Sequence, residues 1–210
     1  MNIVDTLRRS LRNQVASPPT PSRENVKAVI DLTAAKVVEA LQAQAMTFYL
    51  VEGNKIAFKQ VYYSPTLWGA DKAREKKFRD TAVKLLALRI PLGKGEVGKV
   101  IQTGKPSYYR RSVNPEKLAI LNKGSGFQVK SMLTVPLKDP VTLGAIQVLN
   151  KELVAGTDGE FTDEDSALLR EVAKYSSAFL HQITVLQYEP SVEAMARFAS
   201  ALTDLCRRPK

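Results

Sequence analysis

The stretch SMLTVPLKDPVTLGAIQVLNK, residues 131–151, determines how the rest of the chain is interpreted. SMLTVPL and LGAIQVL each have about the length of one strand and are rich in Val, Ile, Leu and Thr, which favour strands. Residues 138–140, Lys-Asp-Pro, interrupt the apolar pattern between them. The stretch therefore predicts two neighbouring antiparallel strands. The second strand ends at Asn150 and Lys151, and a helix is expected to begin near Thr162.

Upstream of this strand pair, the sequence predicts a helix followed by two more strands. The helix is expected over residues 23–43, where apolar side chains recur at helical spacing. MTFYLVE (46–52) and KIAFKQVYY (55–63) have strand composition, and the Gly53-Asn54 pair between them is typical of a tight turn. Alternation along the second segment predicts that four of its side chains face one way: Ile56, Phe58, Gln60 and Tyr62.

The middle of the chain contains a basic segment followed by short elements. Residues 65–87 are rich in Lys and Arg and are predicted as a helical insertion. RIPL (89–92) and SYYRR (107–111) have the composition of short strands, and residues 93–104 combine a glycine turn with a short helix. Residues 112–126 are expected to form a loop. The apolar edge of the insertion is predicted to consist of Phe78, Ala82, Leu85 and Leu86.

The central domain is expected over residues 23–188. Residues 1–22 precede it, with apolar side chains at helical spacing and then the Pro/Ser linker ASPPTPS. This segment is consistent with a short amphipathic helix and equally with a frayed extension. A long helix is expected over residues 162–187, and residues 189–210 supply a further helix or a linker after Pro190. The order of elements indicates an α+β fold with an antiparallel sheet.

Charge and composition restrict the classes of function. The formal net charge is +10, but the excess is scattered and no aromatic side chains are interleaved with it, so a solvated basic surface is favoured over a nucleic-acid site. Cys206 and His181 are single residues of their kinds, which excludes an internal disulfide and a His/Cys metal cluster. No apolar run reaches the roughly 18 residues of a membrane span. We therefore expect a cytoplasmic protein without cofactor or metal.

Gly93, Gly95 and Gly98 match the spacing of a dinucleotide fingerprint, and Lys99 extends it to the start of a phosphate-binding loop. Such a loop needs Ser or Thr after the lysine, whereas this chain has Val100. The fingerprint also needs a long helix and a following parallel strand, which this short segment does not provide. We interpret the glycines as a turn into a short helix that covers the sheet.

Several segments, in order, resemble the GAF family of small-molecule sensor domains over residues 25–187. They are IPLGKGEVGKVIQTGKP, GFQVKSMLTVPL, LGAIQVLNK and FTDED. The resemblance implies an antiparallel sheet of about six strands, with long helices on one face and short helices and loops covering a pocket on the other. Asn150, Lys151, Phe161 and Asp165 match a motif of the phosphodiesterase-type members, although Ser166 stands where Glu is frequent. We assign these residues a structural clamp in which Lys151 pairs with Asp165; a capping box between Thr162 and Asp165 is the competing interpretation.

The same resemblance implies where a ligand would bind. The positions that contact cyclic nucleotides in such domains correspond to Thr47, Tyr62, Val97, Asn122, Ser125, Val129 and Gln147. Asn122 and Val129 depart from the acid and the Thr frequent in the family, which removes hydrogen-bond partners for a purine. A small polar ligand in a mainly apolar pocket, and a filled core without ligand, both remain consistent with these residues.

The expected function is that of a non-catalytic regulatory module. It would bind a cyclic nucleotide or another metabolite and relay its state through the flanking helices to an output domain or effector, in cis or in trans. The terminal helices are expected to pair two copies into a homodimer. The alternative is a ligand-free dimerisation or docking module of a larger signalling protein or a secretion- or pilus-type ATPase. Neither nucleic acid nor a transmembrane segment is expected.

Overall fold

The computed structural model describes residues 23–110, 113–116, 118, 127–138, 140–152, 159–184, 186 and 190–207. The predicted N-terminal segment 1–22 lies outside these residues, and so do Asn122 and Ser125 of the predicted ligand site. The expected domain boundary at residue 188 also falls among residues that are not described.

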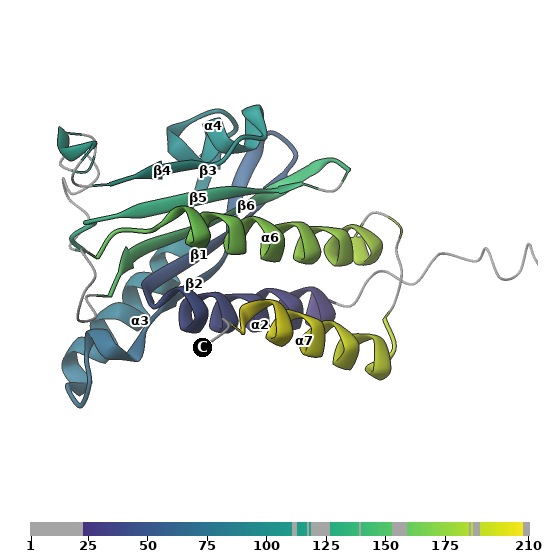
Figure 1. The fold of residues 1–210 in the computed structure, drawn as a ribbon, viewed down its shortest axis with the longest axis horizontal. Coiled ribbons are helices and arrows are strands. Elements are labelled where there is room, and N and C mark those ends of the chain that lie inside the picture. The colour runs from purple at the N-terminus through teal and green to yellow at the C-terminus, as the bar shows by residue number, and fades with distance from the viewer. Residues whose placement is uncertain are drawn as a thin grey trace, which may run out of the picture.

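One antiparallel sheet of six strands forms the centre of the molecule, in the order β3-β2-β1-β6-β5-β4 (Figure 1). Every strand pairs antiparallel with its neighbours, which confirms the predicted α+β class and excludes a parallel wound layer for these strands. The strands are β1 (Ala43–Glu52), β2 (Lys55–Tyr63), β3 (Arg89–Pro91), β4 (Ser107–Tyr109), β5 (Met132–Lys138) and β6 (Thr142–Lys151).

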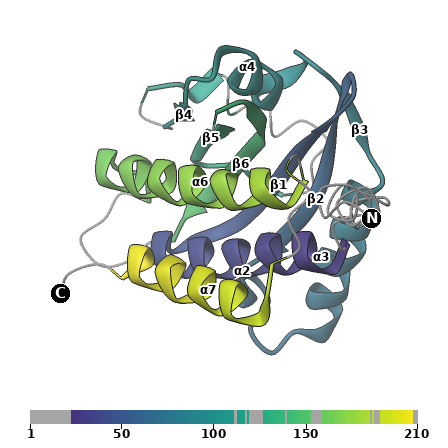
Figure 2. The same ribbon diagram turned by 90° about the vertical axis from the view of Figure 1, so that its right-hand side faces the viewer.

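Two long helices, α2 (Arg23–Leu41) and α6 (Asp163–Thr184), cover one face of the sheet, as expected from their apolar stripes (Figure 2). Phe48, Leu133 and Ile146 of the sheet are fully buried in the cluster that these helices complete. The main core of the molecule therefore lies between this face and the helix layer.

Helix α7 (Val192–Cys206) lies against both α2 and α6 on the side away from the sheet (Figure 2). Its Phe198 is 1% exposed and stacks on Phe179 and Tyr175 of α6, with ring centroids 4.6 and 5.2 Å away. Leu202, one turn further on, is fully buried. The C-terminal helix thus contributes side chains to the same core as the sheet and the long helices.

Short elements cover the opposite face of the sheet. Helix α4 (Gly95–Thr103) lies over β5 and β6, while α3 (Lys72–Leu86) packs beside β2 (Figure 1). A 3-10 helix, η1 (Pro65–Leu67), connects β2 to α3. None of the 15 residues of α3 is fully buried, so its predicted apolar edge is only half-buried. We call the face under α4 the roof face.

An irregularity in β2 overturns one prediction about its faces. The pairing with β1 shifts register between Phe48 and Tyr49, so that Lys59 is an extra residue in β2. Before this point Phe58 lies on the roof face, but after it Tyr62 packs against the cluster under the long helices. The prediction that Ile56, Phe58, Gln60 and Tyr62 share a face is therefore wrong, because a bulge reverses the alternation that follows it.

Within the described ranges, no helix combines the length and the apolar character that crossing a lipid bilayer requires.

Candidate functional site

The junction between β6 and α6 holds a buried ion pair. The Lys151 ammonium contacts the Asp165 carboxylate, and the two side chains are 6% and 0% exposed. Lys151 stands at the end of β6 and Asp165 in the first turn of α6, so the pair joins the sheet to its longest helix. Separating such a pair leaves an uncompensated charge in a dry environment, which makes the contact costly to break.

The same carboxylate also caps α6. Asp165 Oδ2 accepts the backbone N–H of Thr162 at 2.8 Å, and Thr162 Oγ1 accepts the backbone N–H of Asp165 at 3.2 Å. This reciprocal arrangement is a capping box. The clamp and the capping box, which the sequence presents as alternatives, thus occur together and share one carboxylate oxygen.

Asn150 fixes the chain that enters β5. Its φ of 55° is a left-handed conformation that Asn tolerates better than most residues. The amide oxygen accepts the backbone N–H groups of Lys130 at 2.6 Å and Ser131 at 3.3 Å. The amide nitrogen donates to the Gln128 carbonyl at 2.7 Å and to Gln44 Oε1 at 3.0 Å. One side chain therefore satisfies a whole turn beside the sheet.

Ser131 and Phe161 complete this junction. Ser131 Oγ donates to the Gly159 carbonyl at 3.0 Å and accepts the backbone N–H of Lys151 at 3.2 Å. Phe161 is 2% exposed and belongs to the main core. Asn150, Lys151 and Phe161 thus hold the chain before and after β6 in one place, and none of them faces an open space.

A second polar group lies in the middle of the roof face. Thr47, Gln147 and Thr134 are cross-strand neighbours on β1, β6 and β5. The Gln147 amide donates to Thr134 Oγ1 at 3.0 Å, and its oxygen accepts the Tyr49 hydroxyl at 3.3 Å. Burial raises the pKa of Tyr49 far above its usual range, so the phenol stays neutral and remains a donor.

Apolar side chains surround this polar group. Val97 and Val100 of α4 are buried beside Tyr49 and Ala145, while Val129 is buried beside Met132. The structure therefore brings together Thr47, Val97, Val129 and Gln147 of the predicted ligand positions on one side of the sheet. Tyr62 does not join them, since it faces the helix layer.

Tyr63, not Tyr62, points to the roof side, and it belongs to an aromatic pocket of about 430 Å³. The Tyr63 ring lies 4.8 Å from Phe78 of α3 and 5.7 Å from Phe127, measured between centroids. Arg74 and Lys77 of α3 also line this pocket. We call this site the aromatic pocket.

The aromatic pocket has a basic rim. Several charged side chains of α3 pair with each other, including Lys72 and Arg79 with Glu75. Among the described residues, Arg74 and Lys77 form no ion pair, and the pocket lining also includes Asp71, whose carboxylate accepts the backbone N–H of Arg74 at 2.9 Å. The lining therefore carries two positive charges against one negative charge. The sequence predicts Phe78 only as part of the apolar edge of the insertion and the basic charges as a solvated surface, so it does not predict this site. The signal present was the position of Phe78 between basic residues.

Tyr109 donates a hydrogen bond to Glu96 at the entrance of α4. Burial, together with this bond, raises the pKa of Tyr109 to about 12. The folded state therefore holds the phenol proton more tightly than the unfolded chain, whose tyrosines titrate near pH 10. Stability from this group is complete below about pH 10 and is lost as the pH rises toward 12.

We therefore expect the free energy of unfolding to fall with rising pH above about 10, and to fall less steeply in Tyr109→Phe. Denaturant unfolding at several pH values between about 9 and 11 would measure the two slopes. Equal slopes would show that Tyr109 does not contribute.

In the part of the chain that the structure describes, no three His, Cys, Asp or Glu side chains come together as metal ligands. Burial raises the pKa of Cys206 to about 11, so its thiol stays protonated.

A Cβ on Gly98 would lie 2.6 Å from the backbone of Gly93, which shows that this glycine serves close packing of the turn on α4.

Comparison with known proteins agrees with this geometry. The GAF domain family matches residues 24–181. A search of curated proteins found no match. Among solved structures, the chain is similar to the GAF domain of PixJ from Thermosynechococcus elongatus in its blue-light absorbing form. This pair shows a TM-score of 0.56 and 15% identity, covering 82% of this chain and 94% of that one.

Two further structures show the same fold. A GAF domain/HD domain protein from Geobacter sulfurreducens gives a TM-score of 0.54 at 13% identity, covering 76% of this chain and 94% of that one. The GAF domain of an Acinetobacter phosphoenolpyruvate-protein phosphotransferase gives 0.51 at 15%, covering 91% and 99%. The family match spans most of the chain, and the sheet order and helix layers agree with it. The chain belongs to the GAF domain family.

Proposed function

We propose that this chain is a non-catalytic regulatory module that binds a small cytoplasmic metabolite on its roof face. The aromatic pocket is the observation that carries the proposal, because it combines aromatic rings with two cations that have no ion-pair partner among the described residues. The GAF domains of similar structure come from larger proteins of different kinds, including a GAF/HD protein and a phosphotransferase. This variety is consistent with a sensing part that serves different outputs.

The chemistry of the pocket favours a planar molecule that carries an anionic group. Tyr63 and Phe127 present rings on which a flat ligand can stack, while Arg74 and Lys77 supply charge for a phosphate or carboxylate. Cyclic nucleotides are one class of this kind. Gln147 and Thr47 lie further along the same face and would orient polar groups of a ligand that extends beneath α4.

Ligand binding at the roof face would affect the helix layer through the strands. β1 and β6 contribute side chains to both faces, and the Lys151–Asp165 pair joins β6 directly to α6. A ligand would act by favouring one packing of the helices over another, to the extent that its affinity differs between them. The receiver would be an output domain in cis or in trans, or a second copy paired through the terminal helices.

A thermal-shift panel of cyclic nucleotides, aromatic carboxylates and uncharged purines would test this function. A true ligand at 100 times its dissociation constant should stabilise the fold by about 2.7 kcal/mol. Arg74→Gln with Lys77→Gln should weaken an anionic ligand about tenfold or more, because charge-assisted contacts are lost. Lys76→Gln, on the same helix but paired with Asp80, is the matched control and should leave binding unchanged.

A flat panel would contradict the proposal. If the melting temperature of the free protein then rises with protein concentration, the ligand-free dimerisation or docking module is the better description.

A further inference from the structure

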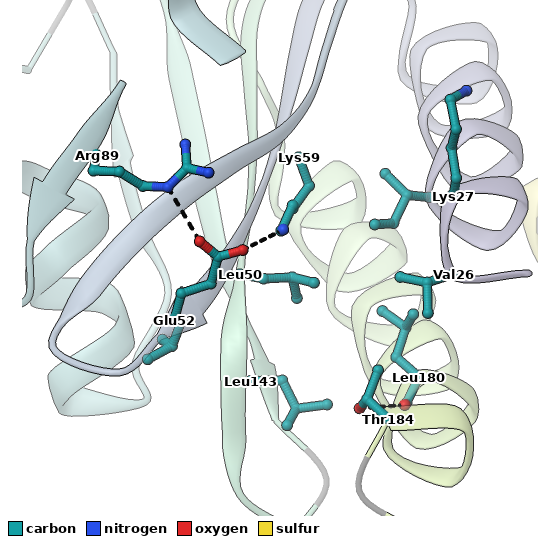
Figure 3. Close-up of a pocket in the computed structure, with 11 residues that line it drawn as sticks. Val26, Lys27, Leu50, Glu52, Lys59, Arg89, Leu143, Leu180 and Thr184 are labelled. Atoms are coloured by element: carbon teal, nitrogen blue, oxygen red, sulfur yellow. Dashed lines mark hydrogen bonds and ion pairs between the residues drawn. The ribbon is translucent and has the colours of Figure 1, made fainter. Parts of the chain in front are cut away.

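A groove of about 710 Å³ opens at the other end of the β1–β2 hairpin from the aromatic pocket. It lies between the first turns of α2, the last turns of α6, the end of β1 and the start of β6 (Figure 3). Its volume is within the range of small-molecule sites. Of the ligand positions expected from the sequence, none that the structure describes lines it.

The wall of this groove is mainly apolar. Leu50 and Leu143 of the sheet and Val26 of α2 point into it, and they are only partly buried (Figure 3). Ile30 and Leu180 form the floor and are almost fully buried. Among the described residues, the helix layer thus covers this end of the main core only in part.

Charged side chains gather along the hairpin side of the groove. Glu52 at the end of β1 contacts Lys59 through one carboxylate oxygen and Arg89 through the other, at 3.1 Å (Figure 3). The three side chains are 31–41% exposed, so solvent and ligands can reach them. Arg89 Nη1 also donates to the Leu86 and Leu88 carbonyls at 3.1 and 2.8 Å, so among the described residues Nη2 is the guanidinium nitrogen that remains for a ligand. Across the groove, Lys27 pairs with Asp31.

One carboxylate therefore serves two cations, which leaves one positive charge at this rim uncompensated by the residues that the structure describes. Lys59 and then Arg89 hold the pKa of Glu52 below its usual range, so this carboxylate is ionised and already engaged at neutral pH. A second anion placed between Lys59 and Arg89 would complete the charge balance. The partly exposed apolar wall of the groove lies next to these cations.

We propose that this groove binds an amphipathic organic monoanion, namely a carboxylate with an aliphatic body. The carboxylate contacts Lys59 and Arg89, and the body lies along Leu50, Leu143 and Val26. This inference does not depend on a ligand at the roof face, because the aromatic pocket shares no lining residue with the groove.

Isothermal titration of the whole chain with decanoate, below its micelle concentration, tests the site, and decanol is the uncharged comparison. Decanoate should bind about tenfold more tightly than decanol. Lys59→Gln with Arg89→Gln should remove this preference. The double variant Lys76→Gln with Arg79→Gln removes two cations that also have carboxylate partners, and it should leave the preference intact.

Glu52→Gln should strengthen decanoate binding, whereas removal of the two cations should weaken it. It removes the internal competitor while both cations stay, so decanoate binding should become about fivefold tighter or more. A merely structural role of the Glu52 cluster would not strengthen binding.

Three results would overturn the inference. Equal binding of decanoate and decanol would show an apolar surface without anion selectivity. Weaker or unchanged decanoate binding in Glu52→Gln would contradict the shared-carboxylate argument. Dimerisation that Leu143→Glu abolishes, seen by sedimentation in a protein that does not bind decanoate, would assign the groove to a second copy of the chain.

Discussion

Replacing Asp165 by alanine is expected to lower the free energy of unfolding by about 3–5 kcal/mol, because the buried Lys151 ammonium then has no counter-charge among the described residues. The substitution also removes the acceptor that caps α6 at Thr162. Few single side chains in the described part of the molecule combine these two roles, so the expected effect is among the largest for the chain. Denaturant unfolding followed by circular dichroism would measure it.

Two further variants separate the charge from the cap. Asp165→Asn keeps an oxygen for the Thr162 N–H but removes the charge. It should therefore be more stable than Asp165→Ala only by the contribution of the cap, about 0.5–2 kcal/mol. The double variant Lys151→Met with Asp165→Leu removes both charges. It should regain most of the stability that Asp165→Ala loses through the unpaired Lys151. As a control, Lys76→Gln on the surface pair with Asp80 should cost less than about 1 kcal/mol. A small effect of Asp165→Ala would mean that water reaches Lys151.

Phe198→Ala is expected to cost about 3–5 kcal/mol, because a fully buried ring is lost from between α7 and α6. The ring stacks on both Phe179 and Tyr175, so its removal leaves a cavity that small shifts of α7 cannot close. Denaturant unfolding would give the total loss of stability, and amide hydrogen exchange would show whether α7 opens separately from the sheet.

Val192→Ala is the matched control on the same helix. Val192 is 82% exposed, so this change should stay within about 0.5 kcal/mol. A Phe198→Ala variant as stable as Val192→Ala would contradict the packing of α7 described above.

Much of the fold could be predicted from the sequence because local patterns and tertiary structure agree. The strand composition of residues 131–151 matched β5 and β6, and the apolar stripe of the long helix matched α6 within a few residues. These elements bury one complete face, so their periodicity is strong. The packing of α7 onto α2 and α6 was harder to foresee, since the same apolar stripe could contact a partner.

The candidate site was predicted less well, because it depends on register and on contacts distant in sequence. Tyr62 was expected at the pocket, but the extra residue at Lys59 places Tyr63 there instead. A bulge has no distinct composition, and alternation alone cannot reveal it. The aromatic pocket needs Phe78 and Phe127 to meet Tyr63, and nothing in their spacing along the chain announces that contact.

The extra residue at Lys59 also limits how β2 can slide along β1. In a regular antiparallel pair, a slip of two residues keeps every side chain on its face, so alternative alignments can compete. Here such a slip would carry the irregularity to a new partner and turn some side chains of β2 to the wrong face. The hairpin therefore holds one alignment, and it behaves as a spacer of constant length between the aromatic pocket at Tyr63 and the groove at Glu52.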